Sequence, residues 1–191
     1  MDKSASRTEG ARPTSQVAQY HKAASARPTG RERMRLVIAS DHRGYVAKTQ
    51  LIVSLSHFDC ELVDLGCDGS GNCDYPDYAA PAARLVACGD ADAAVLLDGS
   101  GIGMGIVANK IRGIRAATAH DEITARIARE HNHCNVLCVG TDLVSEKALA
   151  RIVEIFLTTP FSEGRHIRRV AKIGEIEECE AAPSLKMSSS A

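Results

Sequence analysis

Short apolar runs alternate with segments of helical periodicity along the middle of this chain. Five runs have the continuous apolar character of strands buried in a parallel sheet: 35–40, 61–65, 93–98, 114–119 and 135–140. After the first run, Ala47, Leu51 and Leu55 recur at the spacing of one buried helical stripe. The later intervals predict helices at 78–88, 105–112, 121–130, 145–158 and 163–173.

This alternation predicts the α/β fold class. Strands joined by right-handed helical crossovers form a three-layer α/β/α sandwich around a Rossmann-like, five-stranded parallel sheet. Ligands bind beyond the carboxyl ends of the strands in such a sheet. Polar residues are expected to converge there, because the strand ends carry Asp41-His42, Asp98-Gly99-Ser100, His120-Asp121 and Thr141-Asp142.

The two ends of the chain lack this pattern. Residues 1–33 are rich in Ala, Ser, Thr and Arg, so we expect a disordered N-terminal extension. Its seven basic and three acidic residues also suit a mitochondrial transit peptide, although a solvated extension is the simpler interpretation. A second disordered tail is expected at 180–191, which leaves one domain at 34–179.

Composition argues against several classes of function. A net charge of −1, 4% aromatic residues and no Trp give neither the field nor the stacking surfaces that nucleic acids require. No apolar run is long enough to cross a membrane, and the first residues lack a secretory signal. We expect a cytoplasmic protein that binds no nucleic acid and no membrane.

The cysteines and histidines do not predict a metal site. Seven cysteines without regular spacing are expected to be reduced thiols. His131, His133 and Cys134 stand close together, but no second pair lies at the spacing of a tetrahedral site. We expect no metal and no other cofactor.

The most informative segment is the glycine-rich stretch at 98–105, Asp-Gly-Ser-Gly-Ile-Gly-Met-Gly, which follows an apolar strand. Its glycines let backbone N–H groups point at one spot, which favours a phosphate or the oxyanion of an enediolate. A tight connection without a ligand is the alternative. A dinucleotide fingerprint at Gly103-x-Gly105-x-x-Ala108 fits poorly, because only about two turns of helix precede the next strand.

Asp98 is a candidate base for proton transfer. It stands where a buried strand meets the loop, and partial desolvation there would raise the pKa of its carboxyl. A turn-forming Asp that accepts the loop's own N–H groups would have a lowered pKa and be a poor base. The sequence leaves both possibilities open.

Two further groups suit sugar phosphate chemistry. His131-Asn132 combines an imidazole that can transfer a proton with an amide that can bind a hydroxyl, although a His near a helix end also stabilises the helix dipole. Arg165 and Arg169 stand one helical turn apart and could grip a phosphate or form a solvated basic face.

Six ordered motifs resemble the family of type B ribose-5-phosphate isomerases and galactose-6-phosphate isomerase subunits. The resemblance covers about residues 34–175. The motifs are Ser40-Asp41-His42-Arg43-Gly44-Tyr45, Asp74-Tyr75-Pro76-Asp77-Tyr78-Ala79, Gly99-Ser100-Gly101-Ile102-Gly103, Ala108-Asn109-Lys110, Glu130-His131-Asn132 and Gly164-Arg165-His166-x-x-Arg169.

The resemblance implies a metal-free aldose–ketose isomerase, dimeric or tetrameric, whose active sites are shared between subunits. It implies that Asp41 and Asn132 hold sugar oxygens, that His131 assists opening of the furanose ring, and that Tyr75 lines the pocket.

The same resemblance implies an anion site and a phosphate site. Ser100 and the loop glycines Gly99, Gly101 and Gly103 would stabilise the enediolate. His42, Arg165 and Arg169 would receive the phosphate, some of them from the neighbouring subunit.

Two positions depart from the family. Its members usually carry the C2 base as Cys where this chain has Asp98, or as Glu where it has Met104. One galactose-6-phosphate isomerase subunit similarly has Asp at the first position. An Arg that commonly faces the phosphate is replaced by Asp142, and this change should repel a phosphate by on the order of 1 kcal/mol.

The sequence therefore predicts an isomerase that converts ribose 5-phosphate to ribulose 5-phosphate through a cis-enediolate, with Asp98, Ser100 and His131 as catalytic residues. An isomerase of a tetrose or hexose phosphate is the nearest alternative. A catalytically weak sugar-phosphate-binding subunit is the alternative from a different class.

Overall fold

The computed structural model describes residues 33–69 and 71–181. Within them a five-stranded parallel sheet has the order β2-β1-β3-β5-β4, which confirms the predicted α/β fold. The strands are β1 (Met34–Ser40), β2 (Cys60–Asp64), β3 (Ala93–Asp98), β4 (Ala116–Thr118) and β5 (Val136–Gly140). Most of the expected N-terminal extension and C-terminal tail lies outside the described residues.

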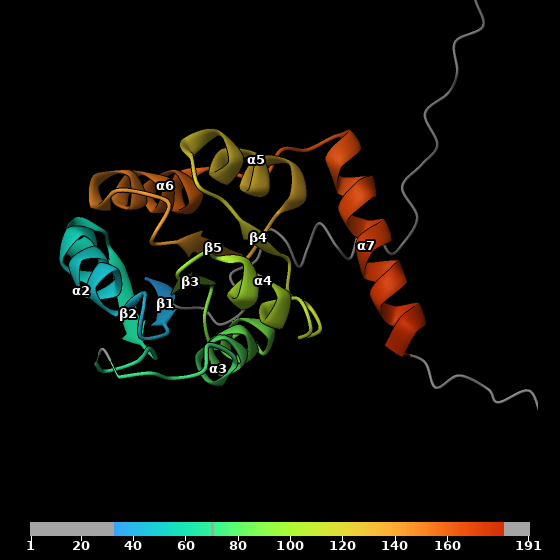
Figure 1. The fold of residues 1–191 in the computed structure, drawn as a ribbon. Coiled ribbons are helices and arrows are strands. Elements are labelled where there is room, and N and C mark those ends of the chain that lie inside the picture. The colour runs from blue at the N-terminus through green and yellow to red at the C-terminus, as the bar shows by residue number, and fades with distance from the viewer. Residues whose placement is uncertain (1–32, 70, 182–191) are drawn as a thin grey trace, which may run out of the picture.

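Helices cover both faces of the sheet (Figure 1). One face packs against α2 (Tyr45–Ser54), α5 (Glu122–Asn132) and α6 (Glu146–Thr158), and the other against α3 (Pro76–Ala87) and α4 (Ile102–Ala108). A short 3₁₀ turn, Leu55–His57, follows α2. The central strand β3 is apolar up to Asp98 because it is buried along its whole length between the two helical layers.

The register of the sheet brings three strand ends level with one another. Ser40 pairs with Leu97, and Asp98 pairs with Gly140. The N–H of Asp41 donates to the carbonyl of Leu97 at 3.1 Å, and that of Thr141 donates to Asp98 at 2.8 Å. The segments that follow β1, β3 and β5 therefore lie side by side at the carboxyl edge of the sheet.

Helices α3 and α4 begin before their predicted starts. The helix predicted at 105–112 is α4 at Ile102–Ala108, because Gly101 adopts the left-handed region (φ 77°) and turns the chain directly into the helix. Gly103 and Gly105 are therefore helical rather than loop residues. The helix predicted to begin at 78 starts at Pro76, whose fixed φ suits the first turn.

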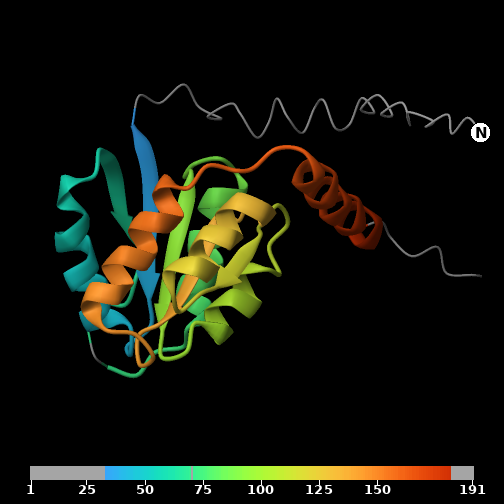
Figure 2. The same cartoon turned by 90° about the horizontal axis from the view of Figure 1, so that it is seen from above.

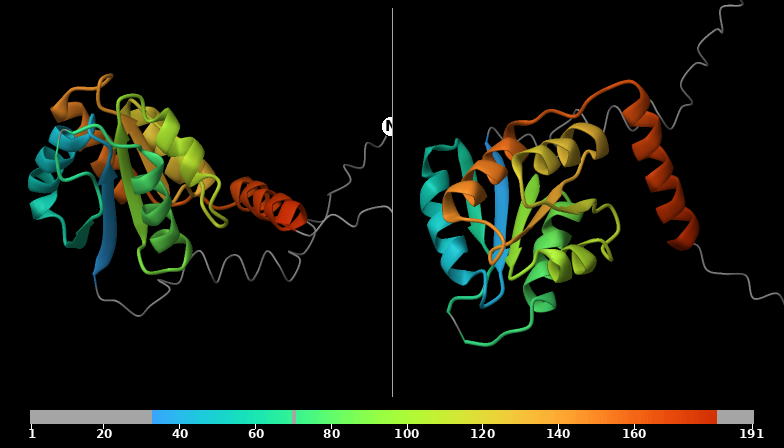
Figure 3. Two further views of the ribbon diagram at one scale, coloured as in Figure 1. Left: turned by 60° about the horizontal axis from the view of Figure 1, so that its bottom comes forward. Right: turned by 45° about the horizontal axis from the view of Figure 1, so that its top comes forward.

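The last helix, α7 (Arg165–Ala181), projects away from the sandwich (Figures 2 and 3). It runs past the predicted end at 173 and includes the first two residues of the expected tail. Its early turns bury His166, Ile167 and Val170, and later Glu177 accepts the N–H of Gly113 at 2.9 Å. In the part of the chain that the structure describes, no helix is long and apolar enough to cross a membrane.

Candidate active site

Asp98 ends β3 beneath the glycine loop, and only 4% of its surface is exposed. Its Oδ1 accepts the backbone N–H of Ser100 at 2.8 Å and that of Gly101, while Oδ2 accepts the N–H of Met104 at 3.2 Å. The amide groups of the loop thus converge on the chain's own carboxylate. This is the turn-forming arrangement that the sequence left open, and it leaves Oδ2 with one long hydrogen bond.

The other loop groups are held from the side of β4. The hydroxyl of Thr118 donates to the carbonyl of Gly101 at 3.0 Å, and Nε2 of His120 lies 3.0 Å from the carbonyl of Ser100. The hydroxyl oxygen of Ser100 accepts the N–H of Ile102 at 3.2 Å, which leaves the hydroxyl hydrogen free to point elsewhere. The N–H of Gly103 has no hydrogen-bond partner among residues 33–69 and 71–181.

Tyr75 lies over the loop. A Cβ on Gly103 would lie 2.9 Å from Cζ of the Tyr75 ring, so glycine permits this contact. Tyr75 is 40% exposed, and its ring forms one wall beside the start of α4. Tyr75 therefore contacts the glycine loop, and its role as a pocket residue stays a prediction.

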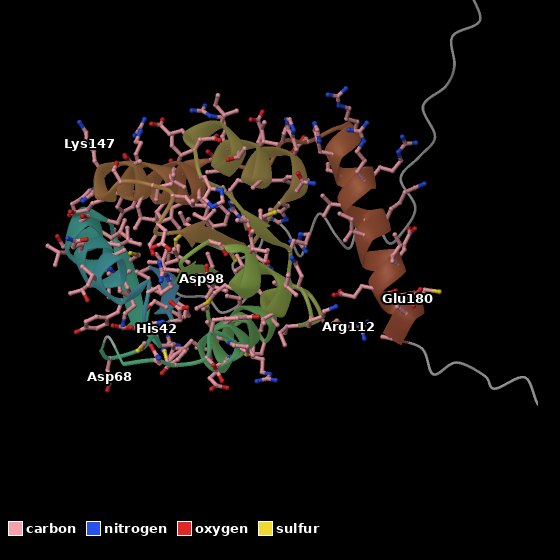
Figure 4. The ribbon with its side chains drawn as sticks, viewed as in Figure 1. His42, Asp68, Asp98, Arg112, Lys147 and Glu180 are labelled. Atoms are coloured by element: carbon pink, nitrogen blue, oxygen red, sulfur yellow. The ribbon has the colours of Figure 1, made fainter. Side chains whose placement is uncertain are left out.

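Asp41 and His42 lie beside the loop at the end of β1. Asp41 is buried, and its Oδ1 accepts the N–H groups of Arg43 at 2.8 Å and of Gly44 at 3.0 Å. Nδ1 of His42 lies 3.3 Å from the carbonyl of Cys73 in the segment that leads to Tyr75. Figure 4 shows His42 and Asp98 on the sandwich, apart from α7.

The remaining predicted site residues lie at the other edge of the sheet. The helix α5 begins beyond the carboxyl end of β4, and its 11 residues span roughly 16 Å before they end at Asn132, near the start of β5. The carbonyl of Asn132 accepts Nε of Arg115, just before β4. A single chain therefore keeps His131 and Asn132 apart from Asp98 and Ser100.

Basic side chains gather around His131. Its ring stacks on that of His166, with centroids 4.2 Å apart and planes within 8°. Burial lowers the pKa of His166, and the charges of His131, Arg165 and Arg169 lower it further. Both predicted phosphate-binding arginines thus lie close enough to this stack to act on it electrostatically.

Residues 36–173 match the family described as ribose/galactose isomerase. This chain belongs to the ribose/galactose isomerase family. Ribose-5-phosphate isomerase B of Escherichia coli is 35% identical over 144 residues, which are 75% of this chain and 97% of that protein.

Solved members of the ribose/galactose isomerase family share the fold. Ribose-5-phosphate isomerase B of Clostridium thermocellum matches with a TM-score of 0.76 and 39% identity, over 78% of this chain and 100% of that one. The Mycoplasma genitalium protein, solved with bound ribulose-5-phosphate, matches with a TM-score of 0.73 and 38% identity over 76% and 97% of the two chains. The family resemblance carried by the six motifs is confirmed.

The structure shows the surroundings of Met104 and Asp98, the positions where the resemblance implied a Glu or Cys base. Met104 is fully buried in the core under α4. The thiol nearest in the sheet is Cys138 of β5, which is fully buried, and both burial and the nearby Asp98 raise its pKa. Among the loop residues 98–105, Asp98 is the one with an ionisable side chain.

Asp142 pairs with Arg43. Nε of Arg43 donates to Oδ2 of Asp142 at 3.0 Å, and Nη2 makes a second bond to the same oxygen. A cation from the end of β1 therefore stands beside Asp142, at the position where the resemblance implied an arginine.

Sequence reasoning missed three residues that contact the loop or lie against it: Arg43, Thr118 and His120. His120 was noted only as a strand-end residue, and Arg43 only as part of a motif. The position after a strand was the available signal for both.

The trio His131, His133 and Cys134 is dispersed. His131 stacks on His166, whereas His133 stacks on Phe161 with centroids 4.7 Å apart, and Cys134 is buried. Among residues 33–69 and 71–181, no three His, Cys, Asp or Glu side chains are grouped so that they could hold a metal ion.

Proposed function

We propose that this protein is an aldose–ketose isomerase of sugar phosphates, and that it converts ribose 5-phosphate to ribulose 5-phosphate through a cis-enediolate. The observation that carries the proposal is the buried Asp98 carboxylate beside Ser100 in the glycine loop of a ribose/galactose isomerase family member. The name of the Escherichia coli relative and the ligand of the Mycoplasma structure support a pentose phosphate.

We assign proton transfer to Asp98 although it has the turn-forming arrangement, whose N–H bonds weaken a carboxylate as a base, because its two oxygens are bonded unequally. Oδ1 holds the loop through two N–H groups, while Oδ2, with one bond at 3.2 Å, has a lone pair for the substrate. Oδ2 takes the proton from C2 and returns it to C1. Because the loop amides are already arranged around Asp98, the base is fixed before the sugar binds.

Ser100 and Gly103 serve the negative oxygen. The open-chain aldose places its carbonyl oxygen against the hydroxyl hydrogen of Ser100 and the N–H of Gly103, which no described residue accepts, and both hydrogen bonds strengthen as charge develops there. The proton on O2 passes to O1 through the Ser100 hydroxyl. Tyr75 covers Gly103, and Gly99 and Gly101 let the loop approach the sugar closely.

A second copy of the chain completes the site. It brings His131 to open the furanose ring, Asn132 to join Asp41 in binding sugar oxygens, and Arg165 and Arg169 to join His42 at the phosphate. Two half-sites at opposite edges of one subunit suit a homodimer or homotetramer with shared active sites.

Exposed apolar side chains support such an assembly. Six isoleucines on three helices are between 41% and 70% exposed. Exposed apolar side chains on this scale are typical of a surface that another subunit covers. The six isoleucines lie on α4, α5 and α7: Ile102, Ile106, Ile123, Ile127, Ile173 and Ile176.

The test is turnover of a panel of tetrose, pentose and hexose phosphates by the full chain in D₂O. Ribose 5-phosphate is expected to give the highest kcat/KM, with deuterium from solvent incorporated at C1 of ribulose 5-phosphate. If another sugar phosphate of the panel is the only one turned over, the assigned substrate is wrong and the proposed mechanism stands. If a sugar phosphate raises the thermal stability of the protein but none is turned over, the protein is a binding subunit and not an enzyme.

A further inference from the structure

The carboxyl edge of the sheet carries far more negative than positive charge. The connecting segments there are 41–44, 65–75, 99–101, 119–121 and 141–145, and Arg43 is the one Arg or Lys in their sequence. The same segments contain five acids, Asp41, Asp68, Asp74, Asp121 and Asp142. A phosphate that approaches this edge is repelled unless a cation stands next to it.

Arg43 lies against the glycine loop. A Cβ on Gly99 would lie 2.8 Å from Nε of Arg43 and 2.9 Å from Oδ2 of Asp142, so the ion pair packs directly on the Cα next to Asp98. The Arg43 backbone is held by Asp41, which accepts its N–H at 2.8 Å. The one strand-end guanidinium is thereby placed beside the proposed base.

Asp142 orients this guanidinium and leaves part of its N–H groups available for a ligand. Nε and Nη2 both bind the single oxygen Oδ2, so two of the five guanidinium N–H groups are engaged. The other three have no partner in the described part of the chain. The two side chains are 56% and 45% exposed, so a substrate can reach them.

An ion pair this exposed contributes little to stability, which leaves its close packing on Gly99 without a structural purpose. A guanidinium with free N–H groups in one plane is the protein group best suited to a phosphate monoester. We propose that Arg43 binds the substrate's phosphate from this half-site and that Asp142 is a positioning residue that aims it. This inference rests on the proposed function and adds a residue that makes the site selective for phosphorylated over free sugars.

The test is a double-mutant cycle with Arg43→Ala, Asp142→Asn and the double variant, read as KM and kcat for ribose 5-phosphate and as inhibition by inorganic phosphate. Arg43→Ala is expected to raise KM and the phosphate inhibition constant about tenfold or more, with kcat changed less than about threefold. Arg151→Ala is the matched control, because Arg151 is a similarly exposed arginine paired with Glu122 and Glu154. That control should leave all three constants unchanged.

The sign of the Asp142→Asn effect is the sharpest readout. In the wild-type background it should raise KM a few-fold, because Arg43 loses its orientation. In the Arg43→Ala background it should lower KM, because it removes an unpaired carboxylate beside the phosphate. An unchanged KM and phosphate inhibition constant in Arg43→Ala, or the same sign in both backgrounds, would overturn the inference.

Binding of inorganic phosphate, measured by calorimetry on the intact oligomer, separates this inference from the proposed function. If no sugar phosphate is turned over but Arg43→Ala still weakens phosphate binding about tenfold, the proposed reaction fails and the role of Arg43 stands. If turnover is normal and phosphate binding is insensitive to Arg43, the role of Arg43 fails alone.

Discussion

Asp98 combines two tasks in one carboxylate. In the proposed reaction Oδ1 holds the loop, and Oδ2, which accepts only the N–H of Met104 among the described residues, takes the substrate proton. An amide in place of the acid keeps an oxygen that accepts the N–H groups of Ser100 and Gly101, loses the acceptor of the Met104 N–H, and cannot take a proton. The two tasks can therefore be separated by a nearly isosteric change.

Asp98→Asn is expected to lower kcat by about 100-fold or more and to leave KM within a few-fold of wild type. Cys138→Ala is the matched variant and should keep near wild-type kcat, since Cys138 lies in the neighbouring strand β5, opposite Leu96, and its raised pKa keeps it out of proton transfer. Steady-state kinetics of both variants on ribose 5-phosphate check this prediction. Near wild-type turnover by Asp98→Asn would show that the base lies elsewhere.

The sequence predicted the loop residues better than their neighbours. Asp98 and Ser100 could be singled out because strand ends and glycine spacing are local signals, whereas Tyr75 was implied only by the family resemblance. The bond between Arg43 and Asp142 joins residues 99 positions apart, and no local pattern encodes it. Nor could the sequence decide whether the amides around Asp98 face a ligand or Asp98 itself, because that depends on the left-handed turn at Gly101.

Helix α5 is defined at both ends by side-chain and backbone geometry. Asp121 caps its start by accepting the N–H of Thr124 at 2.7 Å, and His133 ends it in the left-handed region (φ 49°). Burial, together with the charges of Arg115 and Arg129, lowers the pKa of His133 to about 4. The helix end that carries His131 and Asn132 is thus linked to pH.

His133 should make the protein less stable in mild acid. Its pKa is about 4 in the folded state against an ordinary 6.5, so the unfolded chain binds the proton first as the pH falls. The free energy of unfolding is expected to fall by on the order of 1 kcal/mol between about pH 6.5 and 4. Denaturant unfolding at several pH values measures this loss.

His133→Asn should remove that part of the pH dependence, since asparagine tolerates a left-handed backbone and does not titrate there. His57→Asn, at an exposed histidine beyond α2, is the control and should retain the wild-type profile. The account of this helix end is wrong if His133→Asn keeps the full acid sensitivity.

The limits of the elements were predicted correctly where the element is fully buried and less well where it is partly exposed. Strand β3 is buried throughout and has its predicted limits, whereas β4 is a three-residue edge strand within the predicted 114–119. Helix α7 extends beyond its predicted end at residue 173. Its last turns make polar contacts, such as that of Glu177 with Gly113, and therefore show no apolar periodicity in the sequence.

The fold as a whole separates the predicted residues into an acidic half-site and a basic one. The carboxyl edge carries Asp41, Asp98 and Asp142, and the other edge carries the His131–His166 stack with Arg165 and Arg169. This division follows from the direction of α5, which leaves one edge and ends at the other. The position of the second copy that the proposed function requires cannot be predicted from local sequence patterns.

Complementation between two inactive variants tests the shared site most directly. Asp98→Asn and His131→Asn are expected to be nearly inactive alone. Heterodimers purified through two different tags should regain about half of the wild-type turnover, because one of the two sites in each dimer is intact. Heterodimers of Asp98→Asn with Ser100→Ala, both in the loop, should regain none. Equal inactivity of the two pairings would contradict a site built from two copies of the chain.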